Sequence, residues 1–402
     1  MDTIQTIRLK KAKQFSLDRK HPWVFSGALH LDNIKCNDGE LVYVENEHKQ
    51  RLGYGHYHKG SITVRIIHFG NEDYKPEIWS NLLQNAWDYR KALGLVNSDS
   101  TNCFRWIHGE GDHCSGLVID VYDQIAVVQC HSIGMYKNLE DIINAIKGVA
   151  KSRISSIVLK SKETLPKEFG KQIEDGIIYG DQSSCIVKEN GISFHINILE
   201  GQKTGFFLDQ RNNRKLVGEF AQGKKILNAF CYTGGFSMYA LSNGAQSVCS
   251  IDISKKAMEL VDQNEVLIQS NIPHEKLAVD VIDYLKNLET DRFDLIILDP
   301  PAFAKSLDKR HQAIQAYKRI NLLAMQKIKT PGFLFTFSCS QVVTEDIFYK
   351  TIVSAGIESH KKIRVVQKLS QGPDHPISLF HPEGSYLKGL ILEINECNAF
   401  PC

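Results

Sequence analysis

A side chain suited to covalent catalysis and one suited to holding a substrate each follow an apolar segment in the C-terminal half of the sequence. Cys339 follows GFLFTFS (332–338), and Asp299 follows FDLIIL (293–298). A thiolate is a strong nucleophile, and a carboxylate can hold the amine of a planar base. If both segments are parallel strands of one sheet, their carboxyl ends share an edge, and the two side chains would face the same cleft. Without the other candidates, the simpler interpretation of Cys339 is a cysteine buried in the core, with no catalytic role.

The loop after Asp299 has a restricted backbone. Pro300 and Pro301 follow directly, so two N–H donors are missing and the loop is stiff. Such a loop could hold a planar base beside the carboxylate. Ala302 follows the two prolines, and an aromatic residue, Phe303, comes one position later.

A loop of small residues separates a strand from a helix in ILNAFCYTGGFSMYAL (226–241). Thr233, Gly234 and Gly235 would let a ligand approach the backbone, and the helix N-terminus offers N–H groups to it. The spacing is not G-x-G-x-x-G, so the dinucleotide-binding fingerprint is absent. A plain strand–turn–helix is the alternative interpretation.

Two aspartates end the next strand-like segments. Asp252 ends SVCSID (247–252), where an acid can accept both hydroxyls of a ribose. Asp280 ends KLAVD (276–280), where it could accept the exocyclic amine of an adenine. Either aspartate could instead be the N-cap of a following helix.

The composition is that of a globular protein, with 43% hydrophobic and 23% charged residues among 402. No apolar run reaches the roughly 18 residues that span a bilayer, and residues 1–13 lack the apolar core of a secretory signal. The ten cysteines include no C-x-x-C pair and no grouping with histidine at zinc-finger spacing. We therefore expect a cytoplasmic protein with no membrane partner and no metal.

The charge is distributed unevenly along the chain. The formal net charge is +2, yet residues 1–70 contain 11 Lys and Arg against 7 Asp and Glu. Any surface that binds nucleic acid should therefore be local, and the N-terminal region is the first place to look.

Three regions differ in their pattern of segments. Residues 1–72 contain short strands separated by turns, which predicts a small β-barrel. Residues 73–195 combine an amphipathic helix at 75–98 with a β-meander at 104–131, which predicts an α+β domain. Residues 196–402 alternate strands and helices, which predicts a doubly wound parallel sheet.

Four motifs in the C-terminal region resemble those of class I S-adenosylmethionine (SAM)-dependent methyltransferases: EGQKTGFFLDQRNNR (200–214), NAFCYTGGFSMYALSNGA with SIDIS (228–254), LDPPAFAKS (298–306) and FSCS (337–340). The whole chain resembles the bacterial large-subunit ribosomal RNA cytosine-5 methyltransferase family of the methyltransferase I type. HPWVFSGAL (21–29) resembles the start of that family's PUA domain, an RNA-binding β-barrel. The resemblance implies a Rossmann-like class I methyltransferase domain preceded by a PUA-like β-barrel and an α+β central domain.

The resemblance also implies a SAM pocket. Its methionine part would be lined by Asn228, Cys231, Thr233 and Gly234. Asp252 would bind the ribose and Asp280 would face the adenine, while Gln210 and Arg211 of FLDQR would lie beside the pocket.

The family's chemistry gives roles to the remaining candidates. Cys339 matches the nucleophile that adds to carbon 6 of a cytosine, which makes carbon 5 able to accept the methyl group. Asp299 matches the residue that holds the base, and Pro300 and Phe303 would contact the substrate. The sequence does not identify the base that removes the carbon-5 proton.

Methylation of a cytosine in 23S ribosomal RNA, free or in an assembling large subunit, is therefore the leading hypothesis. A homodimer is compatible with it, although the sequence does not reveal the oligomeric state. One alternative is transfer to an exocyclic amine of an RNA base, which leaves Cys339 without a role. Another is a non-catalytic RNA-binding factor in ribosome assembly. An NAD-dependent dehydrogenase is disfavoured by the missing glycine fingerprint. The sequence does not show which nucleotide is modified.

Overall fold

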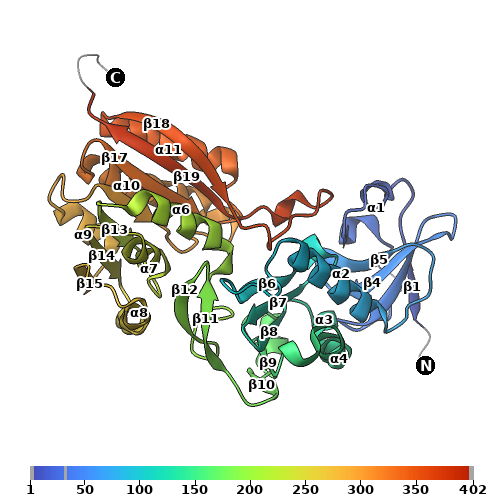
Figure 1. Ribbon diagram of the computed structural model, residues 1–402. Coiled ribbons are helices and arrows are strands. Elements are labelled where there is room, and N and C mark those ends of the chain that lie inside the picture. Colours follow the sequence, from blue (N-terminus) through green and yellow to red (C-terminus); the bar gives the residue numbers. More distant parts are fainter. Residues whose placement is uncertain (1–3, 31–33, 398–402) are drawn as a thin grey trace. The chain divides into compact units, whose positions relative to one another are not determined.

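The computed structural model describes residues 4–30 and 34–397 (Figure 1). The chain forms two compact units, each made of several segments. Unit 1 contains Met1–Val187, Ile196–Leu208 and Pro373–Gly384, and unit 2 contains Lys188–His195, Asp209–Gly372 and Ser385–Cys402. The division into domains 1–72, 73–195 and 196–402 stays a proposal, and it did not anticipate that 373–384 groups with unit 1.

The first sheet of unit 1 has the strand order β1-β3-β4-β5-β2. Its strands are β1 (Gln5–Arg8), β2 (Trp23–Phe25), β3 (Leu41–Glu45), β4 (Arg51–Tyr57) and β5 (Ile62–Phe69), with the short helix α1 (Phe15–Asp18). An antiparallel bridge joins Leu9 to Leu29, just beyond the two edge strands. The sheet thereby curls toward a barrel around a core that includes Val24, Val44 and Val64.

The second sheet of unit 1 has the strand order β10-β9-β8-β7-β6. Its strands are β6 (Cys103–His108), β7 (Leu117–Tyr122), β8 (Ile125–Cys130), β9 (Ser156–Leu159) and β10 (Gly176–Tyr179). The helices are α2 (Ile78–Ala92), α3 (Ile133–Lys137), α4 (Leu139–Ala150) and α5 (Lys167–Gly170). Fully buried Trp79 and Trp106 belong to the apolar core that joins α2 and α4 to this sheet.

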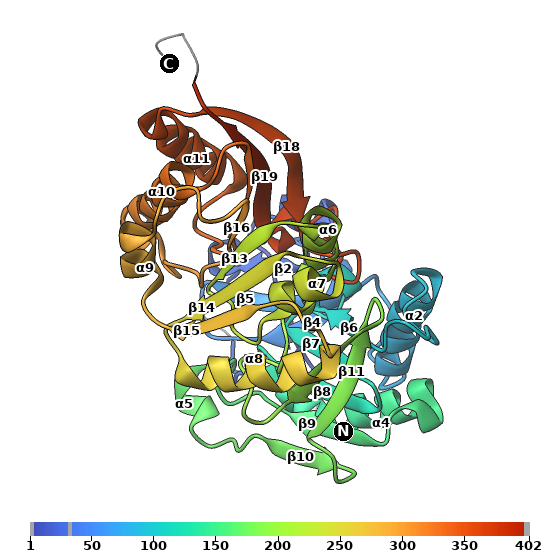
Figure 2. The same cartoon turned by 60° about the vertical axis from the view of Figure 1, so that its left-hand side comes forward.

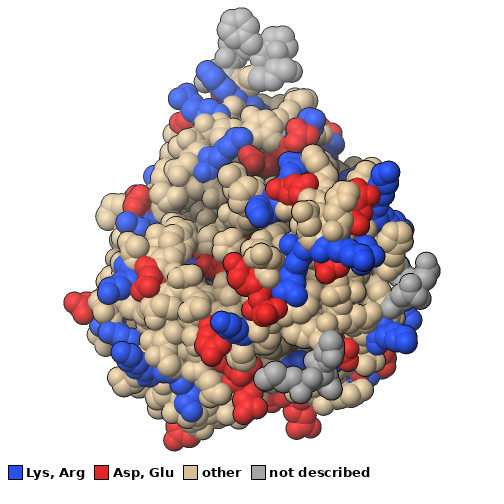
Figure 3. Space-filling model, turned by 90° about the vertical axis from the view of Figure 1, so that its right-hand side faces the viewer, with Lys and Arg blue, Asp and Glu red and all other residues tan. Residues whose placement is uncertain are grey.

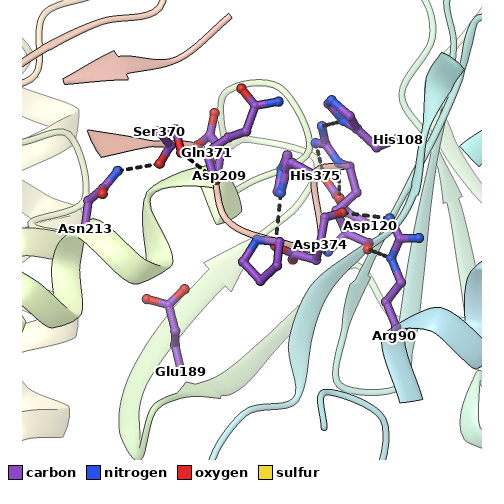
Figure 4. Close-up of polar contacts among 12 residues, drawn as sticks. Arg90, His108, Asp120, Glu189, Asp209, Asn213, Ser370, Gln371, Asp374 and His375 are labelled. Carbon is purple, nitrogen blue, oxygen red and sulfur yellow. Dashed lines mark hydrogen bonds and ion pairs between the residues drawn. The ribbon is translucent and has the colours of Figure 1, made fainter. Parts of the chain in front are cut away.

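Segment 373–384 joins unit 1 through a buried polar network (Figure 4). The guanidinium of Arg90, which is fully buried, donates to both carboxylate oxygens of Asp112 and, at 2.7 Å, to the carbonyl oxygen of Asp374. The backbone N–H of Arg105 donates to the Asp374 carboxylate at 3.0 Å. A buried charge needs such partners, so this network fixes where the segment runs.

Seven strands form the sheet of unit 2, in the order β15-β14-β13-β16-β17-β19-β18. Their bounds are β13 (Lys225–Ala229), β14 (Ser247–Asp252), β15 (His274–Ala278), β16 (Leu295–Leu298), β17 (Gly332–Ser338), β18 (Lys362–Ser370) and β19 (Lys388–Asn395). The strands from β13 to β17 pair in parallel, whereas β19 pairs antiparallel with both neighbours. A separate two-stranded hairpin, β11 (Ser184–Glu189) and β12 (Ile192–Asn197), precedes this sheet in the chain.

Helices cover both faces of the seven-stranded sheet (Figure 2). One group contains α6 (Arg211–Ala221), α7 (Gly235–Ser242) and α8 (Lys255–Ile268), and the other contains α9 (Val281–Asn287), α10 (Arg310–Lys327) and α11 (Glu345–Ser359). Strands between two helical layers are buried on both faces, which explains why β16 and β17 are almost wholly apolar in sequence.

The alternation in residues 196–402 correctly predicted a doubly wound sheet, and every strand predicted there is present. The antiparallel arrangement of β19 was not predicted, since its apolar sequence resembles that of a parallel strand. Across the described ranges 4–30 and 34–397, no helix is long and apolar enough to cross a membrane. On the face shown in Figure 3, Lys and Arg side chains are interspersed with Asp and Glu.

Candidate active site

Strands β16 and β17 bring Asp299 and Cys339 to the same edge of the sheet. The strands pair in parallel with Leu298 opposite Thr336, and each candidate follows its strand directly. The pKa of Tyr317 of α10 is affected by both side chains. Burial raises this pKa to about 12, and the negative charges of Cys339 and Asp299 act in the same direction. The predicted thiol and carboxylate are therefore both close to one phenol, at the carboxyl edge where ligands of such sheets bind.

Among residues 334–340, Cys339 is the one that solvent can reach. It is half-buried, whereas residues 334–338 and Ser340 are buried. The Ser340 hydroxyl donates to the carbonyl oxygen of Ala304 at 2.7 Å, which ties the loop after Cys339 to the loop after Asp299. Cys339 is thus partly accessible while its neighbours hold its loop in place.

A buried lysine lies beside the Cys339 loop. Lys388 is 6% exposed and is the ladder partner of Ser338. Its Nζ donates to the carbonyl oxygens of Ser340 at 2.6 Å and Val343 at 2.8 Å. Burial lowers the pKa of Lys388 to about 8, and the charge of a Cys339 thiolate opposes that shift. By the same attraction, the lysine cation favours the thiolate.

Two amide side chains orient the Asp299 carboxylate. Gln210 Nε2 donates to Asp299 Oδ1 at 3.0 Å, and Asn213 Nδ2 donates to Gln210 Oε1 at 2.6 Å. Asn213 also donates to the carbonyl oxygen of Ser370 at 3.2 Å (Figure 4). Gln210 and Asn213 are buried, so the carboxylate has a fixed position. The sequence placed Gln210 beside the cofactor pocket, whereas its side chain donates to Asp299.

The loop between β13 and α7 has a strained backbone. Phe230 and Tyr232 have φ angles of 60° and 48°, and Gly234, the N-cap of α7, has a φ of 74°. The left-handed region costs a residue other than glycine about 1–2 kcal/mol. Asn264 Nδ2 holds the loop by donating to the carbonyl oxygen of Thr233 at 2.9 Å. Strain of this kind concentrates at binding and catalytic sites.

Asn228 lies beneath this loop and is fully buried. Its Nδ2 donates to the hydroxyl of Ser237 at 2.8 Å, which links the end of β13 to the first turn of α7. Its Oδ1 makes no hydrogen bond to the residues that the structure describes. A buried acceptor without a donor is costly, so this oxygen is suited to a donor on a bound molecule.

The two aspartates after β14 and β15 differ in their surroundings. The half-buried Asp252 accepts the N–H of Tyr232 at 3.1 Å and the N–H of Ser254 at 3.0 Å. The N-cap of α8 is Ser254, so the alternative interpretation of Asp252 as a cap is wrong. Asp280 is exposed and caps α9, accepting the N–H of Asp283 at 2.9 Å. Its cap role is therefore present, and contact with an adenine stays a prediction.

Cys231 differs chemically from Cys339. It is buried, and burial raises the pKa of its thiol well above the ordinary value, with the negative charge of Asp252 acting in the same direction. A thiol in these surroundings stays protonated at neutral pH and is a poor nucleophile.

The other predicted residues lie near the same edge. Pro300 is buried, and the half-buried Phe303 packs against Tyr317 with 4.7 Å between ring centroids. Arg211 is buried in the first turn of α6. Lys388, Asn213 and Tyr317 were not predicted as site residues. A lysine at the start of the apolar segment LKGLILEIN was the available signal for Lys388.

Comparison with known proteins gives this arrangement a family. The family described as S-adenosylmethionine-dependent methyltransferase matches residues 178–382, and the family described as PUA-like domain matches residues 7–69. Ribosomal RNA large subunit methyltransferase I from Pseudoalteromonas atlantica is 36% identical over 394 residues, covering 96% of this chain and 99% of the relative. The chain belongs to the ribosomal RNA large subunit methyltransferase I family.

Solved structures agree with the fold of this methyltransferase. A protein described as a SAM-dependent methyltransferase from Streptococcus mutans superposes with a TM-score of 0.82 at 23% identity, covering 97% of this chain and 100% of that one. A methyltransferase structure in complex with S-adenosylhomocysteine has a TM-score of 0.83 at 23% identity, with the same coverage. The predicted fold class and the predicted cofactor, SAM, are confirmed.

Proposed function

We propose that this methyltransferase transfers a methyl group to carbon 5 of a cytosine in 23S ribosomal RNA through a covalent bond to Cys339. The observation that carries the proposal is the pairing of a solvent-accessible thiol with an oriented carboxylate at the ends of adjacent strands. The large-subunit ribosomal RNA named for the relatives supports the substrate. The free RNA and an assembling subunit are both substrates that this proposal allows.

The residues of the strained loop suit the cofactor. The orphaned Oδ1 of buried Asn228 can accept a donor, and Thr233, Gly234 and Cys231 surround the same turn. The half-buried Asp252 carboxylate keeps acceptor capacity for ribose hydroxyls beside its two backbone partners. We assign the methionine part to the loop, the ribose to Asp252 and the adenine side to Asp280.

In the proposed reaction the Cys339 thiolate bonds to carbon 6 of the cytosine, and the ring electrons shift to carbon 5. Bound SAM supplies an electrophilic methyl group, which carbon 5 accepts. A base removes the carbon-5 proton, and the bond between Cys339 and carbon 6 then breaks to return the thiolate. Asp299, held by Gln210, holds the amine and ring nitrogen of the cytosine, while Pro300 and Phe303 shape the site and Arg211 lies beside the cofactor pocket.

Lys388 supports the first step. Its cation lies beside the Cys339 loop and donates to two backbone carbonyl oxygens, which carry no formal charge. A buried cation stabilises a nearby anion strongly, because water screens the attraction poorly there. Lys388 is therefore a positioning residue that raises the thiolate fraction of Cys339.

Two alternative functions make different experimental predictions. Methyl transfer to an exocyclic amine of an RNA base needs no thiol, so it gives no role to Cys339 or to the residues around it. A non-catalytic assembly factor would tolerate loss of Cys339 altogether. Mass spectrometry of digested RNA locates the methyl group and separates the first alternative, while complementation of a deletion strain by Cys339→Ala separates the second.

The remaining parts of the proposal concern assembly and location. We propose that the reaction takes place in the cytoplasm, where RNA contacts the PUA-like domain during ribosome assembly. A homodimer is the proposed assembly, which light scattering of the purified chain tests directly.

The covalent step is tested with RNA that contains 5-fluorocytosine. Fluorine at carbon 5 prevents the final elimination, so the wild-type protein and SAM should form a complex that survives denaturing electrophoresis. Cys339→Ala should form none, whereas Cys185→Ser, which alters another half-buried cysteine, should form it normally. Equal behaviour of wild type and Cys339→Ala would contradict the proposed chemistry.

A further inference from the structure

Three side chains with metal-binding atoms meet in unit 1, whereas the proposed methyltransferase site belongs to unit 2. His21, His381 and Glu383 each offer one such atom, and these atoms lie within 4.8 Å of one another. His21 Nε2 is 3.6 Å from one oxygen of Glu383, and His381 Nε2 is 3.7 Å from the other. The sequence places His21 and His381 360 positions apart, so only the fold reveals the group.

His381 is the most unusual member of this cluster. Its side chain is 4% exposed, and neither ring nitrogen makes a hydrogen bond within the described part of the chain. Among the other histidines with a buried, unbonded nitrogen, His56, His195 and His274, that nitrogen is Nδ1 alone. A buried imidazole with two unbonded nitrogens is unfavourable unless something further binds it.

The surroundings keep His381 ready to act as a ligand. Burial lowers the pKa of its imidazole, so the ring is neutral near pH 7 and has a lone pair to donate. Its ring contacts Trp23, with 4.4 Å between centroids. Glu110 adds a nearby negative charge, and Trp23 Nε1 and Ser115 Oγ hold it by donating to its Oε1 at 2.9 Å and 2.7 Å.

The segment that carries two of the three side chains is fixed independently of the cluster. Arg90 and the N–H of Arg105 hold Asp374 at the start of segment 373–384. A Cβ on Gly111 would lie 2.0 Å from the carbonyl oxygen of Pro376, so this close approach requires glycine. A preformed position for His381 and Glu383 reduces the ordering that a ligand would have to impose.

We propose that His21, His381 and Glu383 bind a divalent transition-metal ion of the zinc type, with water as a fourth ligand. Ligand atoms around tetrahedral zinc lie about 3.3 Å apart, given bonds of about 2.0–2.1 Å. The two distances run to different oxygens of Glu383 and, at 3.6 and 3.7 Å, slightly exceed that spacing. The site is completed when side-chain rotations bring one carboxylate oxygen and both imidazoles, whose ligand atoms already lie within 4.8 Å of one another, to that spacing. Two imidazoles and one carboxylate are ligands that zinc accepts.

Metal binding would determine which ring nitrogen of His21 carries the proton. With metal at Nε2, the ring proton lies on Nδ1, which is 3.4 Å from the carbonyl oxygen of Trp23 and can donate to it. Without metal, Nδ1 can instead accept the N–H of Trp23 at 3.1 Å, which leaves the proton on Nε2 toward Glu383. Metal binding thus selects one tautomer of the His21 ring. Glu383 is half-exposed, with 52% of its side chain accessible, and provides the route of entry.

The ion would link segment 373–384 to the chain just before strand β2, within unit 1. The test uses the full-length, tag-free protein after chelator treatment and dialysis, without RNA or SAM, so it is independent of the proposed reaction. Cobalt(II) serves as the probe because tetrahedral cobalt absorbs visible light. We expect one cobalt ion per chain, displacement by zinc, and quenching of Trp23 fluorescence that is lost in Trp23→Phe.

Variants decide whether these residues are the ligands. His381→Phe and Glu383→Gln should each weaken cobalt binding by about tenfold or more. His68→Phe is the matched control, because His68 forms a similar pair with Glu72 at 2.9 Å but has no third ligand among the described residues. Glu383 is half-exposed, so its variant should fold even if His381→Phe does not. Absence of binding by the wild type, or affinity unchanged in Glu383→Gln, would overturn the proposal.

Discussion

The cysteines at positions 231 and 339 show how surroundings decide reactivity. Both follow strands of the same sheet, yet Cys231 is buried beside the negative Asp252, whereas Cys339 is accessible beside the positive Lys388. The first environment favours a neutral thiol and the second a thiolate. The proposed chemistry accordingly assigns the attack on a ring carbon to Cys339, the accessible one of the two.

Replacing Lys388 by methionine should lower the reactivity of Cys339. Without the cation the thiol pKa rises, so alkylation of Cys339 by iodoacetamide near pH 7 should slow by about tenfold, one unit of pKa. The pKa of Lys388 is lowered to about 8, so the lysine is charged below that pH and loses its charge above it. The difference between wild type and variant should therefore shrink as the pH rises past 8. Peptide mass spectrometry follows the rate at Cys339 alone.

Lys388→Arg is the control for this prediction, because it keeps the charge. It should retain most of the reactivity if electrostatics is the cause. Equal alkylation profiles of wild type and Lys388→Met would show that Lys388 only holds the loop through Ser340 and Val343.

At the scale of elements, the turn between β13 and α7 combines strain with crowding. Gly234 has a φ of 74°, and a Cβ there would lie 3.1 Å from Val261 Cγ2 and 3.2 Å from Met238 Cε. The turn must therefore keep a residue without a side chain, although Phe230 and Tyr232 beside it tolerate left-handed backbone. Strands on both sides fix this loop, because β13 pairs with β14 and β16.

Gly234→Ala should destabilise the protein by about 1–2 kcal/mol from backbone strain, with an added cost from crowding. It should also weaken SAM binding, because the loop must shift. Gly223→Ala is the matched control: its φ is 68°, but a Cβ there meets nothing within 4 Å. Urea unfolding and calorimetric titration with SAM measure both effects. Equal losses of stability in the two variants would show that crowding at Gly234 is unimportant.

At the scale of the whole molecule, the net charge is nearly balanced, so RNA binding has to depend on local positive charge. The N-terminal region holds an excess of basic residues, among them Lys10, Lys11 and Lys13, which are exposed. Lysines that bind phosphates release counterions, which makes affinity depend on salt.

Changing Lys10, Lys11 and Lys13 together to glutamine should weaken RNA binding and reduce its salt dependence, by roughly 0.9 in logarithmic slope for each phosphate that is no longer neutralised. Filter binding over a series of salt concentrations measures this slope. Lys171→Gln with Lys350→Gln is the control, since these exposed lysines pair with Glu168 and Asp346. An unchanged slope in the triple variant would remove this region from the RNA footprint.

The sequence alone determined the doubly wound sheet, because buried parallel strands need continuous apolar segments and each segment ends in a polar residue that marks the carboxyl edge. That rule was enough to predict that Asp299 and Cys339 share one edge of the sheet. It could not assign the cap of α8, since Asp252 and Ser254 are both good caps and only backbone geometry chooses between them.

The tertiary structure decided what depends on distant segments meeting. Lys388 reaches the Cys339 loop because β19 runs antiparallel beside β17, and Gln210 reaches Asp299 across 89 positions. The grouping of His21 with His381 likewise follows from the return of segment 373–384 to unit 1. Local patterns set which residues are buried and where strands end, but chain topology sets which side chains become neighbours, and no local pattern encodes that.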